Sequence, residues 1–189
     1  MDAPTYLPLL NSIAVNEAKG QCLLNAWADS TRDAQLAAVL RFVAIREGEH
    51  AMAFEKRMCE LGFAVDQASA YQFFKNFDEQ LAFLRSNASD AEKVACFRGD
   101  ATRADAGRTG AEQKDPFRNF LADTTMDPLT GALMGRYVCE ERDSGRRLKA
   151  EYDRVCGAAP RNAEIEELRA CVEALQAEVA KLKSLRSVA

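Results

Sequence analysis

Hydrophobic residues recur every three or four positions along most of this chain, and the alternation of apolar and polar residues that marks strands is absent. This spacing places apolar side chains on one face of an α-helix. Proline and glycine are sparse, while the helix formers Ala, Leu, Glu, Arg and Lys dominate. The sequence therefore predicts an all-α protein.

The pattern predicts three long helices, at residues 5–28, 33–61 and 127–155. Pro128 suits the first turn of the third helix, and glycines suit the ends of the second and third, at Gly62 and Gly157.

A long connection separates the second and third of these helices. We expect short helices around residues 70–84 and 90–97, and an irregular polar stretch at 99–115. A weaker helix is expected at residues 117–122, directly after Pro116.

Two parts of the sequence resemble each other. Residues 25–33, NAWADSTRD, align with residues 119–127, NFLADTTMD, with five identities in nine positions and an offset of 94. The same offset places Glu47 opposite Glu141 and His50 opposite Ser144. The repeat predicts two helical hairpins, at residues 5–61 and about 104–156.

Two hairpins joined by a long crossover form a four-helix bundle, which we expect to occupy residues 1–157. Residues 158–189 then hold a short linker and a last helix at 163–185. The apolar residues of that helix follow steps of three and four, with Ile or Val at the a positions and Leu at the d positions: Ile165, Leu168, Val172, Leu175, Val179 and Leu182. Such a heptad favours a parallel homodimeric coiled coil, and the alternative is a helix that packs on its own domain.

Four polar residues interrupt the apolar faces of the long helices. Glu47 and His50 lie between Val43 and Phe54 on the face of the second helix, and their spacing of three puts both on that face. Glu17 on the first helix and Glu141 on the third interrupt equivalent faces. The sequence thus places three carboxylates and the chain's single histidine on the helix faces that point toward the bundle core.

Buried carboxylates without partners cost several kcal/mol each, by a rough general estimate. No Lys or Arg lies on these apolar faces, so protonation, pairing with His50 or a bound cation must neutralise them. A cation would explain all four residues together. The alternative is that Glu47 and His50 are solvated side chains on the helix surface.

This constellation resembles the ferritin-like, rubrerythrin-type family of four-helix bundles. There, two helices each supply a Glu and the other two each supply Glu-x-x-His, and together they bind two iron or manganese ions. The resemblance implies that Glu17, Glu47, His50 and Glu141 are metal ligands. Ser144 stands where the second histidine would be.

The remaining glutamate of the family pattern has one candidate, Glu112, which lies 29 residues before Glu141. The chain contains no Cys-x-x-Cys, so it lacks a rubredoxin domain, and its second half looks degenerate. Either a di-iron site or a single metal ion, with manganese as an alternative metal, is compatible with this set.

Composition narrows the function classes further. The 189 residues carry a net charge of −4, with basic residues scattered among acidic ones, so nucleic acid is not an expected partner. We also expect no membrane association, because no apolar run approaches the roughly 20 residues of a spanning helix. The N-terminus lacks the basic region of a signal peptide, and the six cysteines occur singly, so a cytoplasmic location and reduced thiols are expected.

Two functions are compatible with these features. One is a ferritin-like metal-binding protein, either an iron-handling protein or a non-haem iron oxidoreductase. The other is a non-catalytic ferritin-like scaffold that dimerises, or docks a protein partner, through its C-terminal coiled coil. Whether the protein is an enzyme stays open at this level.

Overall fold

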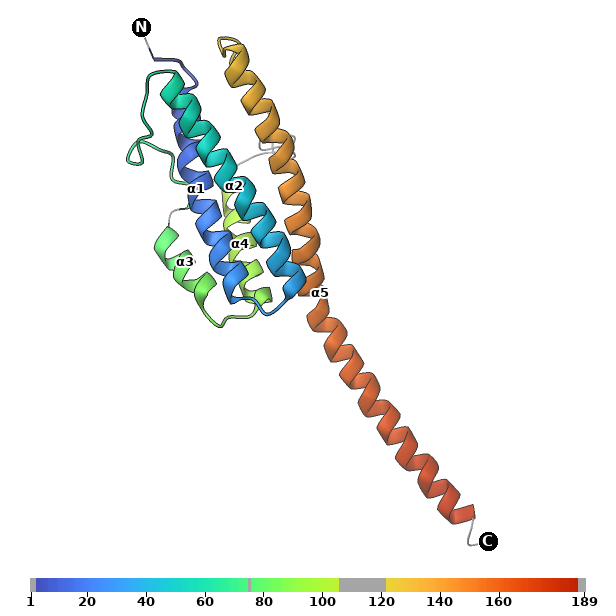
Figure 1. Cartoon of the computed structure of the whole chain (residues 1–189). Coiled ribbons are helices and arrows are strands. Elements are labelled where there is room, and N and C mark those ends of the chain that lie inside the picture. The colour runs from blue at the N-terminus through green and yellow to red at the C-terminus, as the bar shows by residue number, and fades with distance from the viewer. Residues whose placement is uncertain (1–2, 75, 106–121, 187–189) are drawn as a thin grey trace. The chain divides into compact units, whose positions relative to one another are not determined.

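The computed structural model describes residues 3–74, 76–105 and 122–186, with the side chains of 98–105, 158–171 and 173–186 left out. These residues form helices and connecting loops, with no strand among them, which confirms the all-α prediction (Figure 1). The helices in chain order are α1 (Leu7–Ser30), α2 (Ala34–Glu60), α3 (Phe77–Arg85), α4 (Asp90–Asp105) and α5 (Pro128–Arg186).

The first two helices form a hairpin close to the predicted ranges. Asp33 caps the start of α2, where its side chain accepts a hydrogen bond of 2.9 Å from the backbone N–H of Leu36. Gly62 follows the end of α2 with a φ of 87°, a left-handed conformation that glycine adopts without a steric penalty. The predicted apolar face of α2 is buried from Leu36 to Met58.

Polar contacts at both ends fix the direction of α5 against this hairpin. At one end, Asp127 accepts hydrogen bonds from Tyr6 (2.8 Å) and pairs with Arg57 (2.9 Å). At the other, the Gln35 side chain donates to Glu151 across 2.7 Å. The part of α5 up to Glu151 therefore runs parallel to α1 and antiparallel to α2, so the middle of this part lies level with the middles of α1 and α2.

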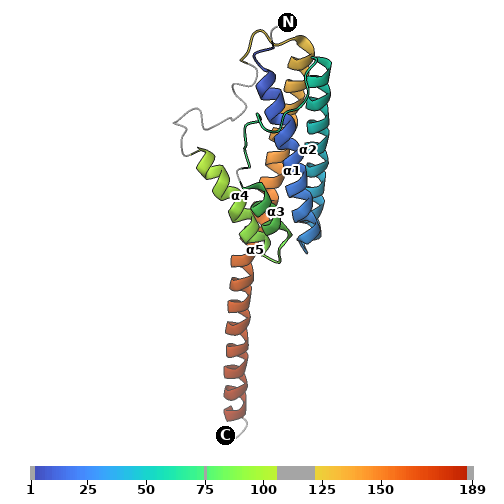
Figure 2. The same ribbon diagram turned by 90° about the vertical axis from the view of Figure 1, so that its left-hand side faces the viewer.

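The short helices α3 and α4 pack near the end of α1, as the views in Figures 1 and 2 show. Trp27, at the end of α1, is fully buried and donates from its indole N–H to Asp90 at the start of α4 across 2.7 Å. Lys93 of α4 is also buried, and its ammonium donates to Ser30 (2.8 Å) and to the carbonyl of Ser86 (3.0 Å).

The connection between α2 and α4 differs from the sequence-based prediction. Residues 70–74 and 76 are not helical, because Asn11 and Asn16 of α1 hold the backbone of residues 66–73 by hydrogen bonds. Helix α4 continues to Asp105, where an irregular stretch from residue 99 was predicted. The alanines and arginines after Gly99 favour helix strongly enough to offset one glycine.

The predicted helix at 117–122 and Glu112 fall largely or wholly outside the described residues. The four-helix bundle with its long crossover, and the second hairpin at 104–156, therefore remain predictions.

The predicted end of the third helix at Gly157 and the linker after it were wrong. Helix α5 continues through residues 158–162 to Arg186. Among the described glycines, Gly62 alone has a positive φ, so Gly157 lacks the conformation by which a glycine ends a helix. A glycine inside a helix costs about 1 kcal/mol, which neighbouring alanines can offset.

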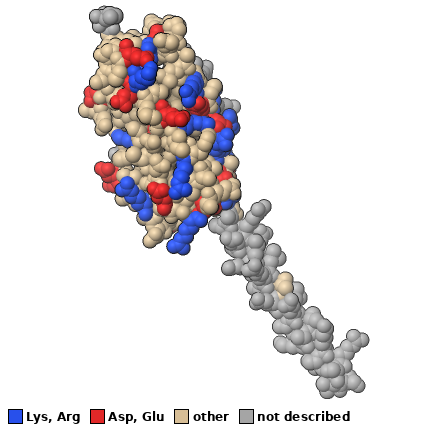
Figure 3. All heavy atoms as spheres, in the orientation of Figure 1, with Lys and Arg blue, Asp and Glu red and all other residues tan. Residues whose placement is uncertain are grey.

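The chain divides into two compact units, Met1–Glu151 and Tyr152–Ala189. Within the described part of the chain, no helix combines the length and the apolar character that crossing a membrane requires. Acidic and basic side chains are interspersed on the face of the first unit in Figure 3.

Candidate metal centre

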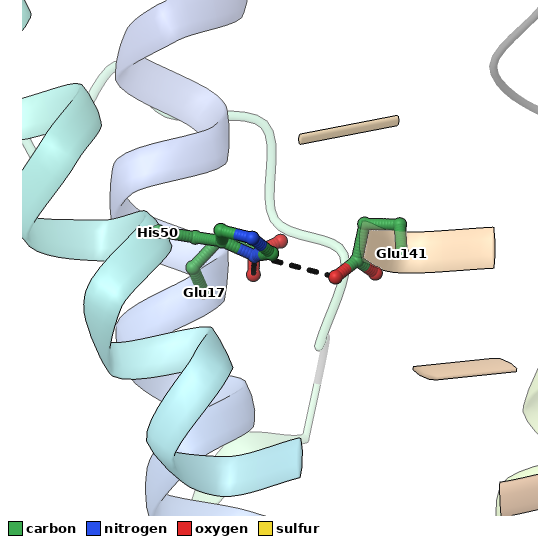
Figure 4. Close-up of side chains that lie close together, drawn as sticks. All are labelled: Glu17, His50 and Glu141. Carbon is green, nitrogen blue, oxygen red and sulfur yellow. Dashed lines mark hydrogen bonds and ion pairs between the residues drawn. The ribbon is translucent and has the colours of Figure 1, made fainter. Parts of the chain in front are cut away.

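Three of the predicted residues converge between the middles of α1 and α2 and the first part of α5. Glu17, His50 and Glu141 each offer one potential ligand atom, and these atoms lie within 4.8 Å of one another. Figure 4 shows the three side chains together, with a dashed line from the His50 ring to the Glu141 carboxylate. Glu17 and His50 are buried, at 6% and 3% exposure. The sequence predicted this convergence from the interrupted apolar faces of the helices.

The imidazole of His50 is surrounded by carboxylates on both sides. Its Nδ1 lies 3.2 Å from Oε2 of Glu17 and 3.3 Å from Oε1 of Glu141. Its Nε2 lies 2.8 Å from Oε2 of Glu140. Burial by itself would lower the pKa of His50, but the close contacts with the carboxylates of Glu141, Glu17 and Glu140 outweigh it and raise that pKa to about 10. Without a metal ion, His50 is therefore an imidazolium at neutral pH.

One buried carboxylate oxygen in this cluster has an ion-pair contact but no hydrogen bond. Oε1 of Glu141 lies 3.3 Å from Nδ1 of His50, and this contact lacks hydrogen-bond geometry. Burial raises the pKa of Glu141, and repulsion from Glu17 adds to this effect. An orphaned buried oxygen of this kind is unusual and costly, and a bound cation would satisfy it.

Glu47 contacts the cluster through Glu17 rather than through His50. Burial, followed by repulsion from Glu17 and Glu141, raises the pKa of Glu47 well above its usual range, and the contact with the Glu17 side chain adds to this rise. Glu47 is not in the group of three close ligand atoms. The Glu47 carboxyl occupies space that Gly20 of α1 leaves open, because a Cβ on Gly20 would lie 2.7 Å from Oε2 of Glu47.

Glu140 is a site residue that the interrupted faces did not single out. It bridges His50 and the surface, because its other oxygen accepts a hydrogen bond of 3.0 Å from Arg136. Burial raises its pKa, but the hydrogen bonds from His50 and Arg136 outweigh this and lower it. The signal in the sequence was the pair Glu140–Glu141, whose two side chains reach opposite edges of the same imidazole.

Arg46 is the second residue that sequence reasoning missed. No Lys or Arg lies on the apolar faces of the helices, yet the guanidinium of Arg46, the residue before Glu47, reaches α5 from beside such a face. Its Nη1 donates to the carbonyl of Glu140 (3.0 Å) and to the side chains of Asp143 (3.1 Å) and Ser144 (3.1 Å). A flexible side chain can leave its helix face in this way, which helical periodicity cannot reveal.

Tyr137 packs against the cluster from α5. Its hydroxyl donates to Oε1 of Glu17 across 2.7 Å, and its ring meets the His50 ring edge-on at a centroid distance of 5.0 Å. Burial, together with the charges of Glu17 and Glu141, raises the pKa of Tyr137 far above its usual range. The phenol therefore stays protonated and orients Glu17.

A cavity of about 250 Å³ opens between α2 and α5 beside His50 and Tyr137. Its walls are apolar at Met52, Ala53 and Leu133 and charged at Glu49 and Arg136. It connects the imidazole edge with solvent, and so provides a route by which water or a small ion reaches the cluster.

The described residues fit a single metal ion. Carboxylates together with an imidazole suit iron and manganese, although the same donors also accept other divalent ions. The buried oxygen of Glu141 that accepts no hydrogen bond is the observation that favours a cation. Glu112, the remaining predicted ligand, lies outside the described residues.

Comparison with protein-family models, with curated proteins and with solved structures found no match for this chain. The resemblance to the ferritin-like, rubrerythrin-type family therefore remains a prediction, which rests on the residues Glu17, Glu47, His50 and Glu141.

Proposed function

We propose that this protein is a ferritin-like metal-binding protein whose centre holds a divalent metal ion, iron in the first place and manganese as the alternative. Glu17, His50 and Glu141 are the ligands, and Glu47 is within reach through Glu17. The observation that carries the proposal is the buried group of three ligand atoms within 4.8 Å that includes an oxygen without a hydrogen bond.

Charge supports a cation at this place. Three glutamates, Glu17, Glu140 and Glu141, contact one imidazole, and Glu47 lies beside Glu17, with Arg46 and Arg136 at the periphery. Without a metal ion, the imidazolium of His50 offsets part of this negative charge, and the pKa of Glu47 is raised. A divalent ion would replace protons at its ligands, since metal ligands bind in their deprotonated forms.

The surrounding residues have separate roles in this proposal. Tyr137 orients Glu17, Glu140 holds the outer edge of His50, and the cavity beside Met52 admits small molecules. Bound iron would supply redox chemistry with oxygen or peroxide, or would itself be the cargo. An oxidoreductase and an iron-handling protein are the two versions of this function.

Elemental analysis of the protein purified without chelator tests the proposal. We expect iron or manganese in the wild type and in Glu55→Ala, an exposed position on α2, and loss of the metal in His50→Ala. Added Fe(II) should raise the melting temperature of the wild type under anaerobic conditions. No metal, together with an unchanged melting temperature, would refute metal binding. Oxygen consumption after Fe(II) addition separates the oxidoreductase from a passive iron-binding protein.

The second candidate function is a scaffold that dimerises, or docks a protein partner, through residues 163–185. The observation in its favour is that α5 is helical throughout this segment, as a coiled coil requires. This function needs no metal and is compatible with the serine at position 144. Its test concerns the whole molecule and is described in the Discussion.

A further inference from the structure

We infer that the centre takes one divalent cation per chain and not two, because Arg46 occupies the half of the site in which the internal repeat expects a second imidazole. This inference rests on the proposed metal binding. The residues at the centre do not fit the two-ion site that the family resemblance implies.

The repeat defines where the second half of the site should be. The offset of 94 pairs Glu47 with Glu141 and His50 with Ser144. Glu141 does reach the cluster, so the correspondence holds for the glutamate. Ser144 is buried at 2% exposure, and its hydroxyl accepts a hydrogen bond of 3.1 Å from Arg46. The position equivalent to the histidine is thus bound to a guanidinium.

Arg46 is held there by several partners. Besides Ser144, its Nη1 donates to the carbonyl of Glu140 and to Asp143. Asp143 in turn pairs with Arg147 across 2.7 Å. The Arg46 guanidinium also lies 4.6 Å from the centroid of the Phe42 ring, and its side chain is only 17% exposed. These contacts leave the guanidinium little freedom to withdraw.

A fixed positive charge between α2 and α5 opposes a second cation. The guanidinium cannot be deprotonated, so it cannot become a ligand, and it repels a divalent ion at close range. It acts on the ligands as well, because its charge opposes the rise in the pKa of Glu47 and Glu141 that burial and neighbouring carboxylates cause. In effect, Arg46 supplies part of the charge that a second metal ion would supply.

The ligands that remain suffice for one ion. Among the described residues, Glu17, His50 and Glu141 form one compact group, with Glu47 beside it. Water can complete the coordination, because the cavity beside His50 reaches solvent.

Anaerobic titration of the full-length protein with Mn(II), followed by equilibrium dialysis and metal analysis, measures the stoichiometry. We expect one equivalent per chain, and a mononuclear Mn(II) signal by electron paramagnetic resonance. Two equivalents with a spin-coupled signal would overturn this inference and leave the proposed metal binding intact. No bound metal in parallel anaerobic titrations with Mn(II) and Fe(II) would overturn both, so the two failures are distinguishable.

A pair of double variants tests the role of Arg46 itself. Arg46→Met combined with Ser144→His removes the guanidinium and restores the imidazole, and should raise the stoichiometry from one to two. Arg147→Met combined with Ser144→His is the matched control, since it removes another arginine partner of Asp143 but leaves Arg46 in place, and should remain at one. Equal stoichiometry in two folded double variants would contradict the role of Arg46, with folding checked by circular dichroism. The wild-type titration stands even if either variant fails to fold.

Discussion

His50 shows how one residue organises the centre of this protein. It is the chain's single histidine, and its ring is the common neighbour of Glu17, Glu140 and Glu141. The carboxylates hold the imidazolium, and the imidazolium makes their burial tolerable. Such a mutually dependent cluster is costly to break, because removal of one member leaves the others as uncompensated buried charges.

Tyr137→Phe removes the hydroxyl that donates to Glu17 across 2.7 Å and keeps the ring packing on His50 and Phe54. We expect the free energy of unfolding to fall by about 1–3 kcal/mol, since a buried carboxylate loses a donor. Urea denaturation of the metal-free protein measures this change. Tyr71→Phe, at a side chain that is 69% exposed, is the control and should be neutral. Equal stability of the two variants would contradict the role assigned to the Tyr137 hydroxyl.

Gly20→Ala tests whether the space beside α1 positions Glu47. The new Cβ would lie 2.7 Å from Oε2 of Glu47, so this carboxyl must move, while the backbone of α1 gains helix propensity. We expect about tenfold weaker Mn(II) binding, equivalent to roughly 1.4 kcal/mol, with little loss of stability. Gly145→Ala, where no atom lies within 4 Å of the new Cβ, should bind Mn(II) as the wild type does. Unchanged affinity in Gly20→Ala would show that Glu47 is not part of the centre.

At the scale of helices, the start of α5 is fixed by Asp127, which holds α5 to both α1 and α2. Its carboxylate accepts from the backbone N–H groups of Leu129 and Thr130, each across 3.0 Å. It also binds the side chains of Tyr6 and Arg57. A single side chain therefore caps one helix and connects it to two others.

Asp127 should make stability depend on pH in the acid range. Hydrogen bonds from Thr130, Tyr6 and Arg57 lower its pKa against the opposing effect of desolvation. A carboxyl with a depressed folded-state pKa contributes stability above its unfolded pKa, near 3.9, and loses it as pH falls through the folded value. Asp127→Asn should therefore be less stable than the wild type at pH 7, by about 1 kcal/mol, with a smaller difference at pH 2–3.

Urea denaturation at several pH values, compared with Asp29→Asn at an exposed ion pair, checks this expectation. A constant difference between Asp127→Asn and the wild type across the pH range would contradict it.

For the whole molecule, the question is whether the chain dimerises. The heptad from Ile165 to Leu182 lies in the second compact unit, Tyr152–Ala189. Val172, at an a position, is 50% exposed in the single chain, as expected of a residue that a partner helix would cover.

Truncation after Gly157 should convert a dimer into a monomer, and Val172→Asp in the full-length chain should do the same. Sedimentation equilibrium measures the mass of each, with Val172→Ile as a control that stays dimeric. Val172→Asp should dissociate the dimer because a charged side chain at an apolar a position costs more free energy than a short coiled coil contributes. A wild type that is monomeric at high concentration would remove the scaffold proposal, and metal binding would be unaffected.

The sequence by itself determined the helices and the residues that face inward. Periodicity decides which side of a helix is apolar, so Glu17, His50 and Glu141 could be predicted to point at one another before any contact was known. Periodicity failed to predict where α5 ends, because the end of a helix depends on the local backbone conformation. Gly62 adopts a left-handed φ and follows the end of α2, whereas Gly157 stays within α5.

Only the tertiary structure decided which neighbours complete the centre. Glu140 and Arg46 lie beside the predicted faces, and their flexible side chains reach His50 and Ser144 across the space between helices. Helical periodicity fixes the direction of a Cβ. The position of a long charged side chain's end depends instead on the hydrogen-bond and ion-pair partners that the neighbouring helices supply.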